Sequence, residues 1–136
     1  ILPQNKPRYL MGVGTPANII RGISHGIDMF DCVMPTRNGR NAMLFTRNGI
    51  MNMRNKKWED DFSPIDESSP LALDKTTTKS YMRHLFVAGE MLGPILASIH
   101  NLAFYLRLVA EARQAVIDGN YETWAAEAEK QTMTRL

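Results

Sequence analysis

The sequence predicts a mixed α/β protein, and three observations support this fold class. Residues 7–36 alternate between an apolar run, a helical pattern and a second apolar run. Asn48-Gly49 lies between two β-prone runs, which is the strongest short signal for a β-hairpin. The last third of the chain repeats its apolar residues with the period of an α-helix. We therefore expect strands in the first half of the chain and helices in the second.

The first stretch has the pattern of a βαβ unit. Residues 8–13 are apolar and β-prone, so we expect a buried strand. A helix follows over residues 17–25, with Thr15 as its N-cap and Pro16 at its first position. The apolar residues 27–34 predict the second strand. Strand, helix and strand over about thirty residues imply a parallel pair with a right-handed crossover.

The middle and last stretches predict a hairpin, a loop and three helices. Residues 42–54 fold back at Asn48-Gly49, and residues 60–78 are rich in Pro, Ser, Asp and Thr, which favours a loop. The helices cover residues 79–90, about 94–118 and from 120 on, with Gly93-Pro94 between the first two. The second helix has an apolar stripe consisting of Ile95, Ile99, Leu102, Leu106 and Val109.

Length and composition exclude several classes of protein. The chain has 136 residues, the size of one domain, and 44% of them are apolar, so it is not a disordered tail. Its apolar runs are shorter than the ~18 residues of a transmembrane helix, and we expect no membrane partner. A single cysteine, Cys32, excludes an internal disulfide and a multi-thiolate metal site. The start at Ile-Leu-Pro, without an initiator Met, suggests a chain cut from a longer protein.

The small formal charge of +2 hides two blocks of opposite sign. Residues 32–57 contain six bases and no acid, and residues 59–67 contain five acids and no base. The two blocks are either solvated faces that attract each other or, with equal weight, a polyanion-binding strip beside an acidic loop. Asparagines between the bases favour RNA or DNA over a membrane surface. The bases are Arg37, Arg40, Arg47, Arg54, Lys56 and Lys57.

Asp31 is the leading candidate for chemistry. It lies at the end of the second predicted strand, just before a Pro-Thr-Arg-Asn-Gly loop, where α/β enzymes place their active sites. A carboxylate there can be a general base, a metal ligand or a nucleophile toward an anomeric carbon. The alternative is a carboxylate that caps the loop. Asp28 is the rival, but we expect it to point to the opposite face.

Two Arg residues on the predicted loop suggest an anion site. Arg37 and Arg40 flank Asn38-Gly39, and the flexible glycine would let the loop approach a ligand closely. Solvation, or an ion pair with Asp31, is an equally weighted alternative.

The first strand and the cysteine offer weaker signals. Tyr9 and Met11 share one face of the strand and can sandwich a flat ring, although such side chains more often belong to a core. Cys32 has no neighbouring His to activate it, so a buried free thiol is the better interpretation than a nucleophile.

Two segments carry a resemblance to a known family. Residues 8–16 read Arg-Tyr-Leu-Met-Gly-Val-Gly-Thr-Pro, and residues 26–41 read Gly-Ile-Asp-Met-Phe-Asp-Cys-Val-Met-Pro-Thr-Arg-Asn-Gly-Arg-Asn. Together with the hairpin, Arg54-Asn55 and residues 100–105, they closely resemble the C-terminal part of bacterial queuine tRNA-ribosyltransferase, also called tRNA-guanine transglycosylase. The resemblance covers roughly residues 6–120.

The resemblance implies the C-terminal portion of a TIM (β/α)8 barrel, about its last two strands, with an inserted subdomain. Residues 1–41 would be the last βαβ part with the catalytic loop. Residues 42–78 would be a hairpin and loop insert at the family's zinc-subdomain position, and residues 79–136 the C-terminal helices. A closed barrel needs about 200–250 residues, so this chain cannot form one alone.

The resemblance also implies a function. It implies a pentosyltransferase of queuosine biosynthesis, which exchanges guanine at the tRNA wobble position for the precursor preQ1. Asp31 would attack ribose C1′ and form a covalent intermediate. The base would be bound by Tyr9, Met11 and Gly12, and the tRNA by Arg37, Asn38, Gly39 and Arg40. We expect a cytoplasmic homodimer and no activity from the isolated chain; the alternative is a non-catalytic tRNA-binding or dimerisation module of the same family.

The family's zinc site is the main departure from the resemblance. The family has a Cys-x-Cys-x-x-Cys cluster and a His twenty-six residues after the last Cys. Here Ser69, Leu71 and Asp74 stand at the three cysteine positions, and His100 is retained. Because Ser and Leu cannot replace Cys as zinc ligands, we expect no zinc and no other cofactor. Apolar packing of Leu71, Leu73 and the helical stripe would then have to hold the insert together.

Overall fold

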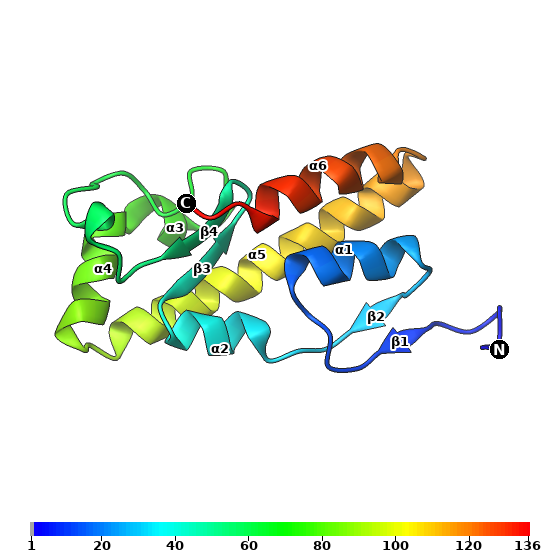
Figure 1. The fold of residues 1–136 in the computed structure, drawn as a ribbon, viewed down its shortest axis with the longest axis horizontal. Coiled ribbons are helices and arrows are strands. Elements are labelled where there is room, and N and C mark those ends of the chain that lie inside the picture. Colours follow the sequence, from blue (N-terminus) through cyan, green and yellow to red (C-terminus); the bar gives the residue numbers. More distant parts are fainter. Residues whose placement is uncertain (1) are drawn as a thin grey trace.

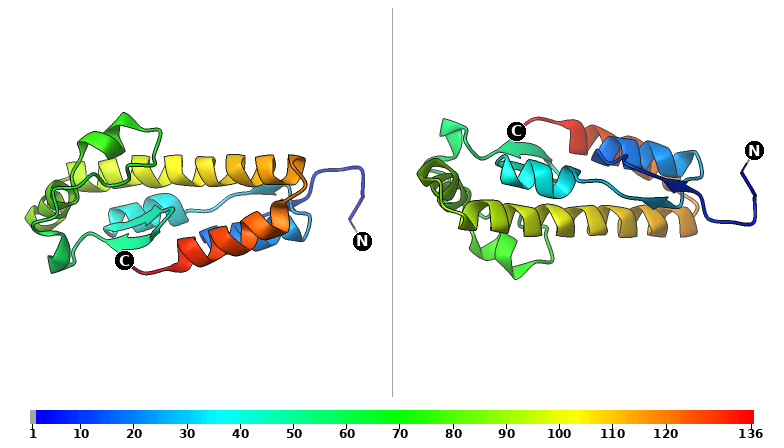
Figure 2. Two further views of the ribbon diagram at one scale, coloured as in Figure 1. Left: turned by 90° about the horizontal axis from the view of Figure 1, so that it is seen from above. Right: turned by 90° about the horizontal axis from the view of Figure 1, so that it is seen from below.

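The protein is elongated, because one long helix runs from end to end of it (Figure 1). The structure is a computed structural model and describes residues 2–136. The long helix is α5 (Leu92–Ile117). Helices α1 (Pro16–Ser24) and α6 (Tyr121–Met133) lie beside each other along one half of it, as both views of Figure 2 also show. Helix α2 (Met34–Arg40) and the hairpin lie along the other half.

The expected βαβ unit is confirmed, but its strands are short and exposed. Strands β1 (Tyr9–Leu10) and β2 (Met29–Phe30) pair in parallel on either side of α1. The Thr15 hydroxyl accepts the Asn18 backbone N–H at 3.2 Å, which confirms the predicted N-cap. The expectation of a buried strand is wrong, because Tyr9 is 53% exposed and β1 and β2 pair only with each other among residues 2–136.

Residues 34–40 form helix α2, although the sequence predicts a loop there. Pro35 fits the first turn, because a proline there gives up no helical hydrogen bond. Gly39 faces α5, and a Cβ at this position would lie 2.9 Å from the Ser98 backbone nitrogen. Gly39 therefore allows two helices to approach closely, and its interpretation as a flexible loop glycine is wrong.

The predicted hairpin is confirmed with its turn one residue earlier. Strands β3 (Met43–Thr46) and β4 (Gly49–Asn52) are antiparallel, and Thr46 pairs with Gly49, so the turn residues are Arg47-Asn48. Gly49 has a φ of 141°, and a Cβ there would collide with the Thr134 carbonyl. The glycine thus permits the C-terminal tail to lie against β4, where the Ile50 N–H donates to that carbonyl at 2.7 Å.

The insert contains two short elements that the sequence did not indicate. The expected loop includes α3 (Ala72–Thr76), after a single 3₁₀ turn at Lys56–Trp58. Helix α4 (Lys79–Ala88) ends at Gly89, whose φ of 74° is left-handed. Helix α5 then begins at Leu92, so Gly93 and Pro94 lie in its first turn and do not separate the helices as expected.

Helix α5 buries the opposite face from the one its apolar stripe suggests. The residues of the predicted stripe are between 40% and 74% exposed. The expectation that this stripe helps to hold the insert together is therefore wrong. The buried face is instead rich in small and polar residues, which let neighbouring elements approach the helix axis. It comprises Gly93, Ala97, His100, Asn101, Phe104, Tyr105, Leu108, Ala112 and Ala115.

Length and composition make α5 the one described helix that could cross a membrane. The expectation that every apolar run is too short to cross a membrane is therefore wrong by helix length and composition. In the structure α5 packs against α2, α4, α6 and β3, and the core helices of globular domains meet the same criterion.

Candidate active site

Asp31 lies where the two parallel strands bring their ends together. The register pairs Tyr9 with Met29, so the Tyr9 side chain reaches the residue just beyond β2. The Tyr9 hydroxyl donates to Asp31 Oδ1 at 2.5 Å, and the Gly12 backbone N–H donates to the same oxygen at 3.1 Å. Asp31 Oδ2 accepts no side-chain hydrogen bond from residues 2–136. The result is an exposed carboxylate with one oxygen fixed and the other free to react.

Hydrogen bonding sets the charge state of this pair. The Tyr9 hydroxyl, and after it the Gly12 N–H, lowers the pKa of the Asp31 carboxyl below its ordinary value. The same bond raises the pKa of the Tyr9 hydroxyl, because the tyrosine proton is held by an anion. Asp31 therefore stays ionised to lower pH than a free aspartate does, while Tyr9 stays protonated.

Replacing Tyr9 with Phe is expected to raise the pKa of Asp31 toward the ordinary value. The substitution removes the main contact that stabilises the carboxylate and leaves the Gly12 N–H in place. NMR titration of ¹³C-labelled aspartate side chains measures this shift. Tyr121→Phe is the control, because that hydroxyl donates to the Ile20 carbonyl and not to Asp31. An unchanged Asp31 titration in Tyr9→Phe would show that the tyrosine does not set its charge state.

Asp28 has structural contacts, and it lines the same surface depression as Asp31, so the expected placement on the opposite face is not observed. Its Oδ2 accepts the backbone N–H of Arg8 at 2.7 Å, and the Arg8 side chain donates to the Gly26 carbonyl at 3.3 Å. These contacts hold the beginning of β1 against the turn before β2. Asp28 therefore braces the strand pair, and Asp31 is the carboxylate that remains available for chemistry.

A mostly apolar depression of about 650 Å³ adjoins Asp31. Tyr9 and Asp31 line it from one side, and α5 lines it from the other. Met11 is 76% exposed and, like the Tyr9 ring, is accessible to a ligand, but it follows the end of β1 at Leu10, so the expected shared strand face with Tyr9 is not observed. The α5 side chains in this depression are Leu102, Tyr105, Leu106 and Val109.

Cys32 and a tyrosine that sequence reasoning missed hold the segment before α1. The Cys32 thiol donates to the Gly14 carbonyl at 3.6 Å, and the buried Tyr105 hydroxyl donates to the same oxygen at 2.7 Å. Burial raises the pKa of Tyr105, so its hydroxyl stays a donor. A Cβ on Gly14 would overlap the Cys32 sulfur, which explains the glycine. Cys32 thus has a packing role, although it is half-buried and not fully buried as expected.

The two charge blocks do not pair with each other. Glu59 and Asp61 form ion pairs with α4, to Arg83 at 3.2 Å and to Lys79 at 3.4 Å. In the basic block, Arg47 pairs with Glu111 of α5 at 3.1 Å. The interpretation as two mutually attracting faces is therefore wrong.

Arg37 and Arg40 lie on α2, which begins three residues after Asp31. Both are exposed, and neither forms an ion pair with an acid among residues 2–136. Asp31 is held by Tyr9 and Gly12, so the alternative of an Arg–Asp31 ion pair is not observed. Asn38, between the two arginines, is half-buried. The helix therefore presents two free cations to a ligand.

Four residues of this chain stand where the family has its zinc ligands, and two of them are in contact. Asp74 of α3 and His100 of α5 are buried, with Oδ1 and Nδ1 2.8 Å apart. Ser69 is buried, and its hydroxyl accepts the Leu71 backbone N–H at 3.2 Å. The Leu71 side chain carries no ligand atom, and residues 2–136 contain no group of three or more His, Cys, Asp or Glu side chains placed to hold a metal ion. This donor set does not fit a structural zinc ion.

Comparison with known proteins identifies the relatives of the chain. The family model described as queuine tRNA-ribosyltransferase matches residues 1–134. Queuine tRNA-ribosyltransferases of Methylibium petroleiphilum and Neisseria gonorrhoeae are 50% and 52% identical to it, and each alignment covers 93% of this chain and 34% of the relative. The Haemophilus influenzae protein of the same name is 51% identical over 93% of this chain and 33% of its own length. The chain thus spans about one third of the length of these curated relatives.

Proposed function

Because the chain belongs to the queuine tRNA-ribosyltransferase family, we propose that it supplies the catalytic carboxylate of a tRNA-guanine transglycosylase. The observation that carries this proposal is the state of Asp31. It is exposed and ionised, with Oδ1 held by the Tyr9 hydroxyl and the Gly12 N–H. A carboxylate fixed in this way is suited to an oxocarbenium-like centre, because it is oriented before the substrate arrives.

The proposed exchange is a double displacement at ribose C1′. In the first step Asp31 attacks C1′ while the bond to N9 of the wobble guanine breaks, and guanine departs with that electron pair and takes up a proton. In the second step preQ1 loses its N9 proton and attacks C1′, which breaks the ester bond to Asp31. Two inversions retain the configuration of the sugar. The lowered pKa of Asp31 helps the second step, because it makes the carboxylate a better leaving group.

The surroundings of Asp31 support roles for its neighbours. The Tyr9 ring is held by the bond to Asp31, and Met11 is exposed two residues further on, so in our proposal the two enclose a flat base together with Gly12. Arg37 and Arg40 would contact phosphates and Asn38 the anticodon strand. Gly39 would contribute by seating α2 against α5.

The uncovered surfaces support a place in a larger barrel. Strands β1 and β2 pair only with each other among the described residues, and the apolar stripe of α5 beside them is exposed. In our proposal the remaining two thirds of the family chain supply the other strands of a TIM barrel, which cover this stripe and the depression next to Asp31. The isolated chain would then be inactive. A cytoplasmic location and a homodimer are proposed from the family resemblance alone.

A non-catalytic tRNA-binding or dimerisation module is the alternative. The free cations of α2 would serve such a module equally well. A binding module has no use, however, for a carboxylate that two donors keep ionised next to an accessible face. The state of Asp31 therefore favours the enzyme.

An exchange assay separates the two functions. A full-length protein that contains this chain is expected to release labelled guanine from tRNA when preQ1 is added, whereas the 136-residue chain is expected to release none. The measurement is the loss of label from tRNA over time, with a tRNA that lacks a wobble guanine as control. Binding of tRNA by the full-length protein without exchange would favour the non-catalytic module.

A further inference from the structure

The buried Tyr105 of α5 reaches the segment that connects β1 to α1. Its ring is 7% exposed and packs edge-on against the rings of Phe45 and Phe104, at centroid distances of 5.5 and 5.7 Å. This packing holds the ring in one orientation. The Tyr105 hydroxyl donates to the Gly14 carbonyl at 2.7 Å, and burial raises the pKa of Tyr105, so the hydroxyl keeps its proton. The side chain therefore presents one hydrogen-bond donor at a fixed place.

Hydrogen bonds hold this connecting segment beside Asp31 at two of its glycines. The Gly12 N–H donates to Asp31 Oδ1 at 3.1 Å. The Gly14 carbonyl accepts the Tyr105 hydroxyl at 2.7 Å and the Cys32 thiol at 3.6 Å. Gly12 has a left-handed φ of 72°, and a Cβ on it would meet no atom of the described chain within 4 Å. Because Gly12 has open space on that side, the direction of its N–H depends on where Gly14 is held.

The two donors at the Gly14 carbonyl differ in strength. A tyrosine hydroxyl at 2.7 Å forms an ordinary hydrogen bond, whereas a thiol at 3.6 Å is a weak donor. We propose that Tyr105 is a positioning residue of the exchange reaction, because it fixes Gly14 and thereby keeps the Gly12 N–H on the carboxylate that attacks. This inference rests on the proposed function, in which Asp31 is the nucleophile.

The expected consequence is a carboxylate that is oriented before the substrate arrives. Without the Tyr105 hydroxyl, the Gly12 N–H would leave Asp31 Oδ1 for part of the time, and Tyr9 would be the remaining side-chain donor to that oxygen. The carboxylate could then turn, so that Oδ2 would face ribose C1′ less often. The free cations of α2 lie outside this segment, so binding of tRNA would persist.

Tyr105→Phe in a full-length protein that contains this chain tests the role, because it keeps the ring and removes the hydroxyl. We expect kcat for guanine exchange to fall about 10-fold, with KM for tRNA unchanged. Tyr121→Phe is the matched control, since its hydroxyl also donates to a backbone carbonyl, that of Ile20 at 2.6 Å. This control is expected to lose some thermal stability and to keep the kcat of the parent. Equal kcat values in the two variants would overturn the proposal.

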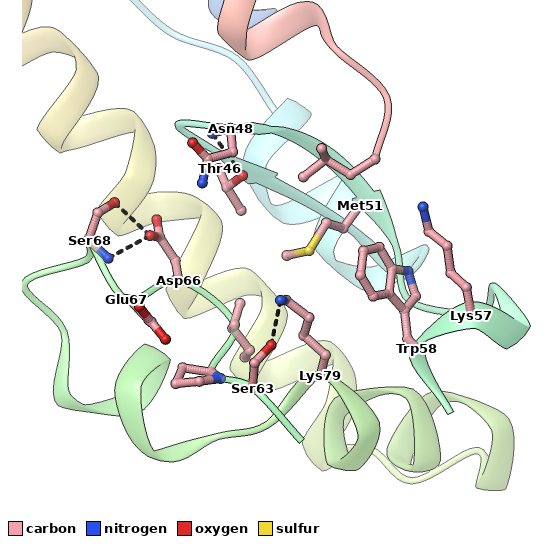
Figure 3. Close-up of a pocket in the computed structure, with 13 residues that line it drawn as sticks. Thr46, Asn48, Met51, Lys57, Trp58, Ser63, Asp66, Glu67, Ser68 and Lys79 are labelled. Atoms are coloured by element: carbon pink, nitrogen blue, oxygen red, sulfur yellow. Dashed lines mark hydrogen bonds between the residues drawn. The ribbon is translucent and has the colours of Figure 1, made fainter. Parts of the chain in front are cut away.

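A hollow of about 600 Å³ between the hairpin and the insert offers a second control (Figure 3). There the Lys79 ammonium donates to the Ser63 hydroxyl at 2.7 Å. Among the described residues that line the hollow, none belongs to the contacts between Tyr105 and Asp31. Ser63→Ala removes this hydrogen bond of the insert and is expected to leave kcat unchanged. A fall in kcat as large as that of Tyr105→Phe would show that exchange responds to any loss of stability, and would overturn the proposal.

The Gly12 amide gives a readout that needs no activity. In the full-length parent its ¹⁵N resonance is expected to follow the titration of Asp31, because the N–H donates to that carboxylate. This pH-dependent shift is expected to shrink in Tyr105→Phe and to persist in Tyr121→Phe. A Gly12 resonance that titrates in Tyr105→Phe as it does in the parent would overturn the positioning role. A smaller shift in Tyr105→Phe, in a parent that exchanges no base, would contradict the proposed function and support the hold of Tyr105 on Asp31.

Discussion

Replacing Asp31 with Asn in a full-length protein that contains this chain is expected to lower guanine exchange by about 10³-fold or more, while tRNA binding persists. The amide keeps the size of the side chain but is not a nucleophile toward C1′, so the covalent route is lost. Asp31 is exposed and makes no core contact, so the fold should not suffer. The measurement is the rate of base exchange at saturating tRNA, beside tRNA affinity from a filter-binding titration.

Two control variants make this result specific. Asp28→Asn alters the neighbouring carboxylate, which braces β1, and is expected to leave most of the exchange rate intact. Arg37→Ala removes a free cation from α2, so it should weaken tRNA binding and reduce the slope of log affinity against log salt by about one. If Asp31→Asn exchanges bases as fast as the parent protein, the nucleophile is another residue.

Replacing Asn101 with Leu is expected to lower the free energy of unfolding by about 3–5 kcal/mol. The Asn101 amide donates to the Pro35 and Met43 carbonyls, both at 2.9 Å, and its oxygen accepts the Phe45 N–H at 3.0 Å. The side chain is fully buried, so all three backbone groups would lose their partner in an apolar environment. Urea unfolding of the protein gives the change in free energy.

Asn120→Leu is the matched control for this substitution. Asn120 is exposed and makes no side-chain cap bond to α6, so the change should stay within about 0.5 kcal/mol. Similar losses in the two variants would mean that the three hydrogen bonds of Asn101 are not what joins α5 to the start of α2 and to β3.

Asn101 also shows why the orientation of α5 could not be predicted from the sequence. The period and the length of the helix were predictable, because its apolar residues recur at three- and four-residue intervals. The buried face of the helix was not predictable, because the more apolar side of the helix is the exposed one. The buried side carries Asn101 and His100, whose polar groups bond the backbone of β3 in place of a neighbouring strand. The adjacent polar residues His100 and Asn101, within the apolar first half of the helix, were the available signal.

The sequence indicated the residues of the candidate site but not their contacts. Strand periodicity and position indicated Asp31, and the N-cap Thr15 followed from local chemistry. The hydrogen bond from Tyr9 depends on the parallel register, which a single sequence does not specify. The role of Gly39 was not predictable for a related reason. The glycine is required by its close contact with the backbone of α5, which lies far along the chain.

Mapping the covalent bond between tRNA and the protein tests the central claim most directly. A full-length protein that contains this chain would be incubated with tRNA, denatured, and digested with nuclease and protease, and the modified peptide would be located by mass spectrometry. The account predicts one ribose-linked peptide with the modification on Asp31, absent from Asp31→Asn and abundant in the Asp28→Asn control. A modification on any other residue, or one that persists in Asp31→Asn, would contradict it.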